Sequence, residues 1–370
     1  MRRPWTLVTA GIAASTPSCF AFVNLSISPV TNIVTHHIPN ERIAVARVTS
    51  LHASPLISAI PTIPPTDIIR TCLGVTLAHR ISKSGLKKGS LSKSGALSAF
   101  IVASLSLATS WRNGITLLSF YLTSSKLTRV GVKIKGKLEE GVTEGGERGA
   151  SQVFACSLIG VICACIRRIG VGKDSPLLLS PSNASSLALL GDQLTLAYVA
   201  FFACCAGDTW ASELGILSRS LPRLIVKPWK RVPPGTNGGV SGVGLLVSAI
   251  GGLVMGLIHG LFVPGGIASL IPSTTASATT LTQFAREVQV LAFVGFVGGL
   301  GGSLLDSLLG ATIQATWYDE EAKKIAKRPG PTTRKVGGFG FLSNEMVNVV
   351  STAVSALVVA MLAGPLLQIM

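Results

Sequence analysis

Two acidic side chains stand at the ends of long apolar stretches, where a charge is costly. Asp208 closes the apolar run 190–214, and Asp306 lies near the end of the run 288–315. A carboxylate within a membrane helix usually faces a cavity or a partner, which makes it a functional hypothesis by default. Carboxylates from two helices can bind Mg²⁺, which takes its other ligands from water and phosphates. We therefore expect Asp208 and Asp306 to bind magnesium; the alternative is pairing with a nearby cation or capping of a helix.

A glycine-rich turn over 235–239 opens the next apolar run, 239–263. Free N–H groups at a helix start favour an anion, and the basic residues just before the turn would neutralise phosphates. We expect Lys230 and Arg231, with Asp208, to act in catalysis. The alternative is a capped loop with Thr236 or Asn237 as the N-cap. The residues predicted to bind the phosphate donor are Lys227, Gly235, Thr236, Asn237, Gly238, Gly239 and Ser241.

Further polar groups stand at the same ends of the apolar runs. Asp208 and Ser212 would share a helix face, whereas Glu213 would point about 140° away from Asp208. Glu213 is therefore a weaker candidate for the ion, with a basic loop residue as its alternative partner. Lys126 and Arg129 are assigned to the acceptor phosphate. Gln314, Asn344 and Asn348 complete the predicted binding residues, although the two asparagines could instead hydrogen-bond a neighbouring helix.

The composition identifies the class of protein that positions these groups. Hydrophobic residues make up 48% of the 370 residues and charged residues only 13%, with a mean hydropathy of +0.56. Soluble domains usually carry about 25% charged residues. We predict an all-α, polytopic membrane helix bundle with about seven to nine segments. The expected segments are 67–82, 95–125, 151–167, 190–214, 239–263, 288–315 and 345–364.

The sequence leaves two features of this predicted helix bundle open. The run 95–125 is interrupted at 110–114, so it is either one long helix or, with slightly more support, a hairpin of two short helices. Residues 1–66 are expected to be an N-terminal segment and linker ahead of the membrane domain 67–370. Arg2 and Arg3 precede an apolar stretch there, which fits a signal anchor, a cleaved signal peptide or an organelle presequence.

The net charge of +16 is concentrated in the loops 125–150, 216–238 and 317–340. The positive-inside rule places these loops in the cytoplasm, so all the polar clusters named above fall at the cytoplasmic ends of their segments. No basic stripe is interleaved with aromatic residues, which argues against binding of nucleic acid. The seven cysteines and five histidines show no metal-ligand spacing.

As an ordered set, several motifs resemble those of the transmembrane protein 19 family, which includes the plant phytyl-phosphate kinase. The resemblance covers about 73–366 and departs at Glu345, where the family often has asparagine. The order of motifs is also similar, more loosely, to that of polyisoprenoid kinases and CDP-diacylglycerol synthases, which use CTP. The matching segments are 84–97, 124–129, 144–148, 207–215, 234–241, 306–314 and 344–348.

Together, the residues and the resemblance imply a nucleotide-dependent isoprenyl-monophosphate kinase that uses Mg²⁺ with CTP or ATP. Its partners would be the lipid bilayer, the isoprenoid phosphate lipid and the nucleotide. The alternatives are a transporter or channel for a small anion or lipid, and a membrane protein without catalytic activity. A transporter should place its key polar groups near the bilayer midplane, whereas these cluster at one end. We expect the endoplasmic reticulum or endomembranes rather than a mitochondrion or plastid.

Overall fold

A computed structural model describes residues 64–142, 145–178, 185–266 and 278–369. The predicted N-terminal segment 1–66 lies outside these residues, apart from its last three positions, and stays a prediction. The described helices are α1 (Pro65–Lys87), α2 (Lys93–Thr109), α3 (Trp111–Arg129), α4 (Val132–Leu138), α5 (Ala150–Ala155), α6 (Leu158–Ile166), the π-helical turn η1 (Arg167–Val171), α7 (Ser186–Gly215), α8 (Gly242–Leu261), α9 (Ala278–Ile313) and α10 (Asn344–Ile369).

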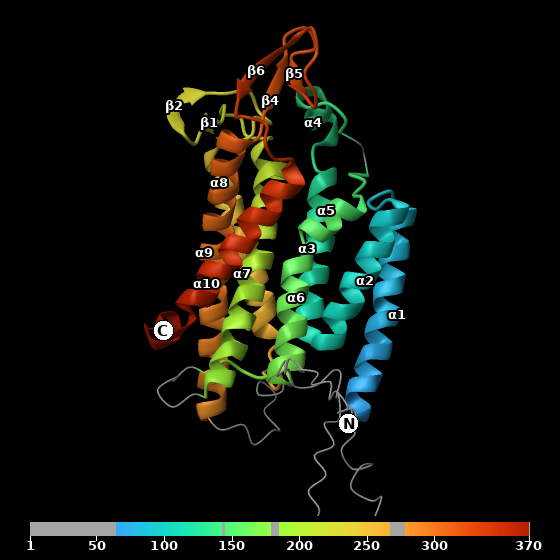
Figure 1. Ribbon diagram of the computed structural model, residues 1–370, viewed down its shortest axis with the longest axis vertical. Helices are drawn as coiled ribbons and strands as arrows, with labels where there is room; N and C mark the ends of the chain where they lie inside the picture. Colours follow the sequence, from blue (N-terminus) through green and yellow to red (C-terminus); the bar gives the residue numbers. More distant parts are fainter. Residues whose placement is uncertain (1–63, 143–144, 179–184, 267–277, 370) are drawn as a thin grey trace, which may run out of the picture. The chain divides into compact units, whose positions relative to one another are not determined.

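Four of the described helices are long and apolar enough to cross a bilayer, namely α7, α8, α9 and α10. The about seven to nine segments expected from the sequence are therefore not confirmed. The run 151–167 is broken into α5 and α6 at Cys156 and Ser157. The helix α2 is apolar but shorter, and α1 carries several charged residues. The four spanning helices pack side by side, with α7 running through the middle of the bundle (Figure 1).

The interrupted run 95–125 is a hairpin, as the sequence slightly favoured. Ser110 ends α2 and begins α3, adopts an extended conformation, and accepts a hydrogen bond from Arg112 N. The two helices pack tightly just beyond this turn, since a Cβ on Gly114 would lie 2.1 Å from Leu107 Cδ2. A small residue is therefore needed at position 114 for the hairpin to close.

Side chains from α2, α3, α6 and α7 form the main apolar core around buried Leu107, Tyr198, Phe201 and Phe202. The helices α8 and α9 meet backbone to backbone. A Cβ on Gly252 would lie only 2.1 Å from the Gly295 carbonyl oxygen. Such close helix contact through glycine is a common packing device in membranes, and Gly207 of α7 approaches α9 in the same way, since a Cβ there would lie 2.5 Å from the Gly299 carbonyl oxygen.

The all-α prediction needs one correction, because the basic loops fold into two small antiparallel sheets. The first, with order β2-β1-β3, contains β1 (Arg223–Leu224), β2 (Lys227–Arg231) and β3 (Gly239–Val240). The second, with order β5-β4-β6, contains β4 (Thr316–Asp319), β5 (Lys324–Ala326) and β6 (Thr333–Gly337). Strands this short lack the length over which alternation of apolar residues is recognisable.

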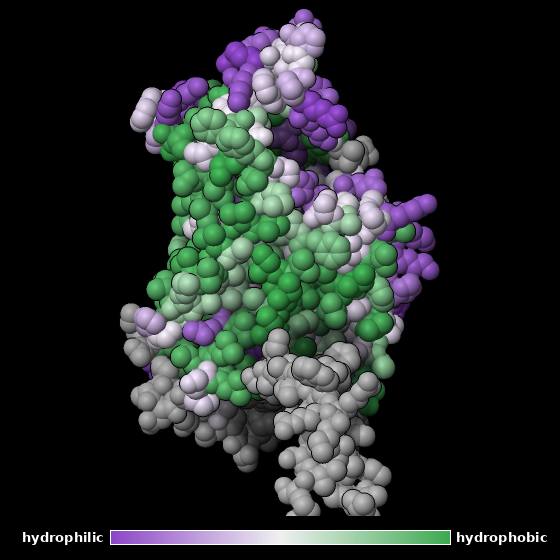
Figure 2. Space-filling view, viewed as in Figure 1, coloured by the Kyte–Doolittle hydropathy of each residue, from purple (hydrophilic) through white to green (hydrophobic). Residues whose placement is uncertain are grey.

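Both sheets and α4 lie at the same end of the bundle (Figure 1), which we call the basic end. In Figure 2 this end is coloured hydrophilic, whereas the sides of the helices below it are largely hydrophobic. The basic loops therefore gather at one end, in agreement with the alternating loop charges.

A buried ion-pair cluster, formed by Arg112, Asp174 and Glu287, closes the opposite end of the bundle. Arg112 is 1% exposed and donates to Asp174 Oδ1 at 2.6 Å and to Glu287 Oε1 at 3.0 Å. Glu287 also accepts a hydrogen bond from Leu177 N, which joins the segment before α7 to α9. Charges this deeply buried are tolerated because each one is paired and hydrogen-bonded.

Candidate functional site

A cavity of about 410 Å³ lies at the basic end, between the spanning helices and α1, α2, α3 and α5. Its walls divide into a polar part and an apolar part. Of the predicted site residues, those that line it are Asp208, Ser212, Glu213, Gly235, Thr236, Asn237, Gly238, Gly239, Ser241, Asp306, Gln314, Asn344 and Asn348. The structure thus brings together residues from α7, the glycine-rich turn, α9 and α10.

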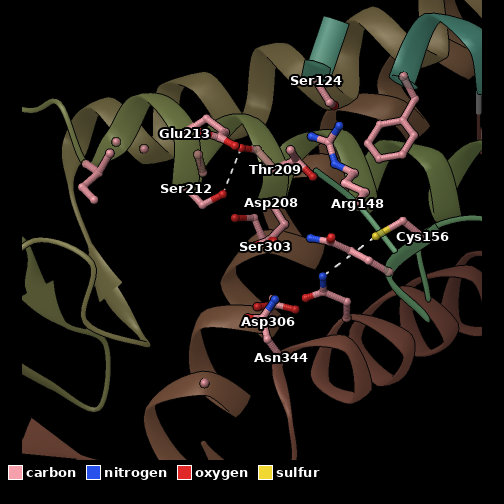
Figure 3. Close-up of a pocket in the computed structure, with 18 of the residues that line it drawn as sticks. Ser124, Arg148, Cys156, Asp208, Thr209, Ser212, Glu213, Ser303, Asp306 and Asn344 are labelled. Atoms are coloured by element: carbon pink, nitrogen blue, oxygen red, sulfur yellow. Dashed lines mark hydrogen bonds between the residues drawn. The ribbon is translucent and has the colours of Figure 1, made fainter. Parts of the chain in front are cut away.

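Asp208 and Asp306 enter the cavity from α7 and α9, as Figure 3 shows. Their carboxyl groups are near enough to interact electrostatically. Asp306 accepts a hydrogen bond from Ser351 Oγ at 2.8 Å. The Asn348 amide, with its nitrogen turned toward Asp306, donates to Oδ2 at 3.2 Å. These donors orient Asp306 but bring no positive charge.

The Asp208 carboxylate has neither an ion pair nor a hydrogen bond within the described ranges. Two facing carboxylates without a cation repel each other, and a divalent cation would relieve that repulsion. No group of three or more acidic, histidine or cysteine side chains forms a metal cage in the described part of the chain. Two carboxylates alone suit Mg²⁺, which commonly takes one or two from the protein and the rest from phosphate and water.

Glu213 has a partner of its own, one turn beyond Asp208 on the uninterrupted helix α7. Lys135 Nζ donates to Glu213 Oε2 at 2.5 Å, and Thr128 Oγ1 donates to Oε1 at 2.7 Å. The alternative of pairing with a basic loop residue is therefore confirmed. Glu213 fixes α4 and the end of α3 to α7, so its oxygens are already engaged.

The glycine-rich turn lies against α9, but it does not begin a helix. The helix α8 starts at Gly242, and its N-cap is Ser241, which accepts from Gly244 N at 3.1 Å. The alternative reading, in which Thr236 or Asn237 is the N-cap of the helix, is therefore wrong. Gly238 is held closely, since a Cβ there would lie 2.3 Å from Ala311 Cβ. The register of β3 with β1 displaces the helix start beyond the turn.

Some of the backbone N–H groups that were expected to bind phosphate donate to acceptors within the protein instead. The N–H groups of Thr236 and Gly239 donate within the turn, and that of Asn237 donates to Thr316 Oγ1 at 3.1 Å. Within the described residues, the N–H groups of Gly235 and Gly238 have no protein acceptor. Both glycines have positive φ, of 84° and 74°, which other residues rarely adopt. Two N–H groups of this turn therefore stay available for a phosphate.

The basic residues chosen from the sequence lie elsewhere. Lys126 and Arg129 are exposed near the end of α3, where Arg129 donates to Lys88 O at 3.2 Å. Lys227, Lys230 and Arg231 are exposed on β2. The residues that line the cavity include none of these five. Their assignment to phosphates stays a prediction, since nothing here tests it.

Arg148 supplies the positive charge that lines the cavity instead. Its guanidinium donates to Ser125 Oγ and Thr128 Oγ1, both at 3.0 Å. Figure 3 draws Arg148 among the residues that line the same cavity as Asp208 and Thr209. Arg148 belongs to the motif 144–148 of the family resemblance, but it was not among the predicted site residues. That motif was the signal that would have found it.

Two further cavity residues were missed. Ser124 is 1% exposed, and its hydroxyl has no partner within the described residues. A buried hydroxyl without a partner is unusual unless a ligand or water satisfies it. Glu139 faces the turn, since a Cβ on Gly235 would lie 2.3 Å from its Oε1. Burial, with the Glu213 carboxylate adding to it, raises the pKa of Glu139, and Lys135 and Lys327 partly oppose that rise.

The apolar part of the cavity extends between α1, α2 and α3. Its lining on this side consists mainly of small and aliphatic side chains, and further apolar residues, among them Ile216, Leu245 and Leu304, line the cavity from the side of α7, α8 and α9. The apolar lining residues on the side of α1, α2, α3 and α5 are Ala78, Ile81, Leu91, Ala99, Val102, Ala103, Leu117, Leu118, Phe120 and Val153. A ligand with an anionic head and an apolar tail matches this division.

Comparison with known proteins gives the family context of this site. The family described as integral membrane protein DUF92 matches residues 76–356. The Arabidopsis thaliana protein called PGR is 36% identical over 282 residues, covering 76% of this chain and 92% of that protein. The Arabidopsis protein called VTE6, chloroplastic, is 24% identical over 281 residues, covering 75% and 67%.

A third relative is an uncharacterized membrane protein, MJ0933, of Methanocaldococcus jannaschii. It is 28% identical over 246 residues, covering 66% of this chain and 73% of that protein. No solved structure is significantly similar to the chain. The matched residues include both cavity aspartates, the glycine-rich turn and Arg148.

Proposed function

This chain belongs to the integral membrane protein family DUF92, which confirms the family resemblance seen in its motifs, and from that premise we propose that it is an isoprenyl-monophosphate kinase. The observation that carries the proposal is that Asp208 and Asp306 line one cavity and that neither carboxylate forms an ion pair within the described residues. A buried repulsion between two such carboxylates costs stability, and a Mg²⁺-bound phosphate would offset that cost.

In the proposed reaction, a phosphate oxygen of the isoprenyl monophosphate forms a bond to the γ-phosphorus of a nucleoside triphosphate. The bond between that phosphorus and the bridging oxygen breaks, and the nucleoside diphosphate leaves. The product is an isoprenyl diphosphate. Little covalent chemistry falls to the protein in such transfers, because positioning and neutralisation of charge supply most of the catalysis.

Asp208 and Asp306 would hold the magnesium ion. When bound, Mg²⁺ would neutralise the phosphate oxygens and draw the two phosphates together. The other cavity groups act on phosphate directly. Arg148 supplies a planar cation suited to phosphate oxygens, and the Gly235 and Gly238 N–H groups, which have no acceptor within the described residues, supply further donors. The Ser124 hydroxyl, which lines the cavity without a partner among the described residues, adds another donor.

The isoprenoid tail would occupy the apolar part of the cavity, between α1, α2 and α3. Several of its lining residues also belong to the main apolar core, namely Ala78, Val102, Ala103, Leu117 and Leu118. The Arg112 ion-pair cluster lies at the opposite end of the bundle. The key polar groups of the cavity lie at one end of the bundle, which favours an enzyme, whereas a transporter should place such groups near the bilayer midplane.

The exposed basic residues of β2 and α3 also have roles in the proposed reaction. Lys227, Lys230 and Arg231 would bind donor phosphates outside the cavity, and Lys126 and Arg129 would act at the acceptor side. CTP and ATP both fit the proposed donor class.

One relative is chloroplastic by name, which favours a plastid over the endoplasmic reticulum that we expected from the sequence.

The test is a transfer assay on the full chain in detergent or nanodiscs, with γ-labelled CTP or ATP, Mg²⁺ and isoprenyl monophosphates. The wild type should form labelled isoprenyl diphosphate, and Asp208→Asn and Asp306→Asn should each lose at least 100-fold in rate. Glu320→Gln, an acid of the exposed sheet, is the matched control and should keep full activity. Folded wild-type protein that transfers no label from either donor would overturn the proposal.

A further inference from the structure

A second pocket of about 410 Å³ lies at the basic end, beside the first. Its charged lining consists of three arginines, Arg219, Arg223 and Arg231. Val240 and Ser241 line both pockets, so the two adjoin where β3 leads into α8. Of these three arginines only Arg231 has a predicted role, as a ligand of donor phosphates outside the first cavity, so the cluster itself has no explanation yet.

The first sheet places two of these arginines directly opposite each other. Arg223 of β1 and Arg231 of β2 are register partners in the antiparallel pair. Opposed residues share a face of the sheet, and like charges in such a position repel each other. Short strands of two and five residues have little pairing with which to resist that repulsion. An anion between the two guanidiniums would turn the repulsion into attraction.

No carboxylate in the described part of the chain pairs with these arginines. None of the three arginines forms an ion pair within the described residues. The single protein acceptor among the described hydrogen bonds is Pro228 O, 3.3 Å from Arg223 Nη1. Most of the guanidinium donors therefore stay free for a ligand. Guanidinium groups suit phosphate, because they can donate two parallel hydrogen bonds to its oxygens.

The surroundings of the pocket are those of a membrane boundary. Leu221, which also lines the pocket, is 53% exposed, and Trp229 on the same sheet is 78% exposed. The spanning helix α8 starts at the pocket, and its first turns carry the exposed side chains Val243 and Leu246. Arginine, tryptophan and leucine together are typical of the zone where lipid head groups meet the hydrocarbon.

We propose that Arg219, Arg223 and Arg231 form a phosphate-binding site separate from the reacting cavity. The phosphate belongs either to the head group of an anionic lipid or to a nucleotide whose far end reaches the first cavity past Val240. Both sources present the same chemistry to the arginines. The proposal does not depend on phosphoryl transfer, because binding alone would test it.

The experiment uses the full chain, delipidated in a neutral detergent, with two ligands measured separately. One arm titrates short-chain phosphatidylglycerol against phosphatidylcholine of the same chain length, with bound lipid counted by native mass spectrometry. The other arm titrates a fluorescent ATP or CTP analogue. The test variant is Arg223→Gln with Arg231→Gln, and the matched control is Arg328→Gln, an exposed arginine between β5 and β6.

The double variant should weaken binding at least tenfold for one ligand, and the control should stay within twofold of the wild type. Weaker binding of phosphatidylglycerol by the double variant assigns the site to lipid. Weaker binding of the nucleotide assigns it to the phosphate donor. Thermal unfolding gives a second measurement. The ligand that binds should raise the wild-type midpoint more than that of the double variant. Wild-type affinity for both ligands in a folded double variant would overturn the proposal.

Discussion

Lys135 Nζ donates to Glu213 Oε2 over 2.5 Å, and this ion pair fastens the short helix α4 to the end of α7 at the edge of the cavity. The lysine side chain is 5% exposed and also donates to the carbonyls of Leu127 and Thr128. Glu213 in turn accepts from Thr128 Oγ1. The acid that follows Asp208 along α7 is therefore a structural group that positions the wall of the site.

Glu213→Gln should destabilise the protein by about 3 kcal/mol, because it leaves a buried ammonium without its counter-charge. Thermal unfolding in detergent measures the change. Glu320→Gln is the control, since Glu320 pairs with Arg334 at the exposed second sheet, and its loss should cost at most about 0.5 kcal/mol. Equal shifts for the two variants would contradict the structural role of Glu213.

Asp208→Asn should have the opposite effect on stability. In the absence of Mg²⁺ and phosphate, it removes one of two repelling carboxylates and should stabilise the protein by roughly 0.5–2 kcal/mol, while abolishing the proposed activity. Asp319→Asn is the matched change outside the cavity. Asp319 accepts from the N–H groups of Glu321 and Ala322, so that variant should destabilise. Destabilisation by Asp208→Asn would mean that this carboxylate has a stabilising partner.

Several parts of this arrangement followed from local sequence. An aspartate in an apolar run is conspicuous whatever the fold, which is why Asp208 and Asp306 were both found. The turn at Ser110 could also be recognised from the sequence, because a polar segment within an apolar run indicates a turn. The long apolar runs that became α7 to α10 were placed to within a few residues, except that α9 begins ten residues before the expected run.

Other parts depended on contacts between distant segments. Arg148 reaches the cavity only because its loop pairs with the chain before α2, where Arg148 N donates to Ser90 O. Glu139 reaches the glycine turn through α4, a helix of seven residues without an apolar pattern. Lys230 and Arg231 were noticed for their charge, but the strand that carries them forms only by pairing with β1. The sequence shows which residues are unusual for their surroundings. Contacts between distant segments determine where their side chains lie.

Glu139 should make stability depend on pH. Burial beside Glu213 raises its pKa above the ordinary value of 4.5, so the folded state retains a proton that the unfolded state releases. This contribution to stability is fully present below about pH 4.5 and is lost as the pH rises through the higher folded pKa. Glu139→Gln cannot lose that proton, so its stability relative to the wild type should increase as the pH rises above 4.5. Unfolding midpoints measured across that range, with Glu140→Gln as the neighbouring control, would show the difference. A constant offset between Glu139→Gln and the wild type at every pH would contradict it.

Ala103 should limit the length of the tail that the cavity accepts. It is 4% exposed, lies on α2, and lines the apolar part of the cavity. Ala103→Phe would fill the space that a long isoprenoid tail needs, but would leave room for a short one. On the proposed function, kcat/KM for geranylgeranyl monophosphate should fall at least tenfold relative to that for geranyl monophosphate, since a single methylene of misfit costs about 10–200-fold.

Leu105→Phe provides the control for this change on the same helix. Leu105 is 46% exposed on the outer surface and does not line the cavity, so the added ring should leave the ratio of the two kcat/KM values unchanged. Bound prenyl phosphate measured by native mass spectrometry separates the tail site from the chemistry. If Ala103→Phe reduced binding of both chain lengths equally, the tail would lie elsewhere, whereas selective loss of the longer chain would locate its end beside α2.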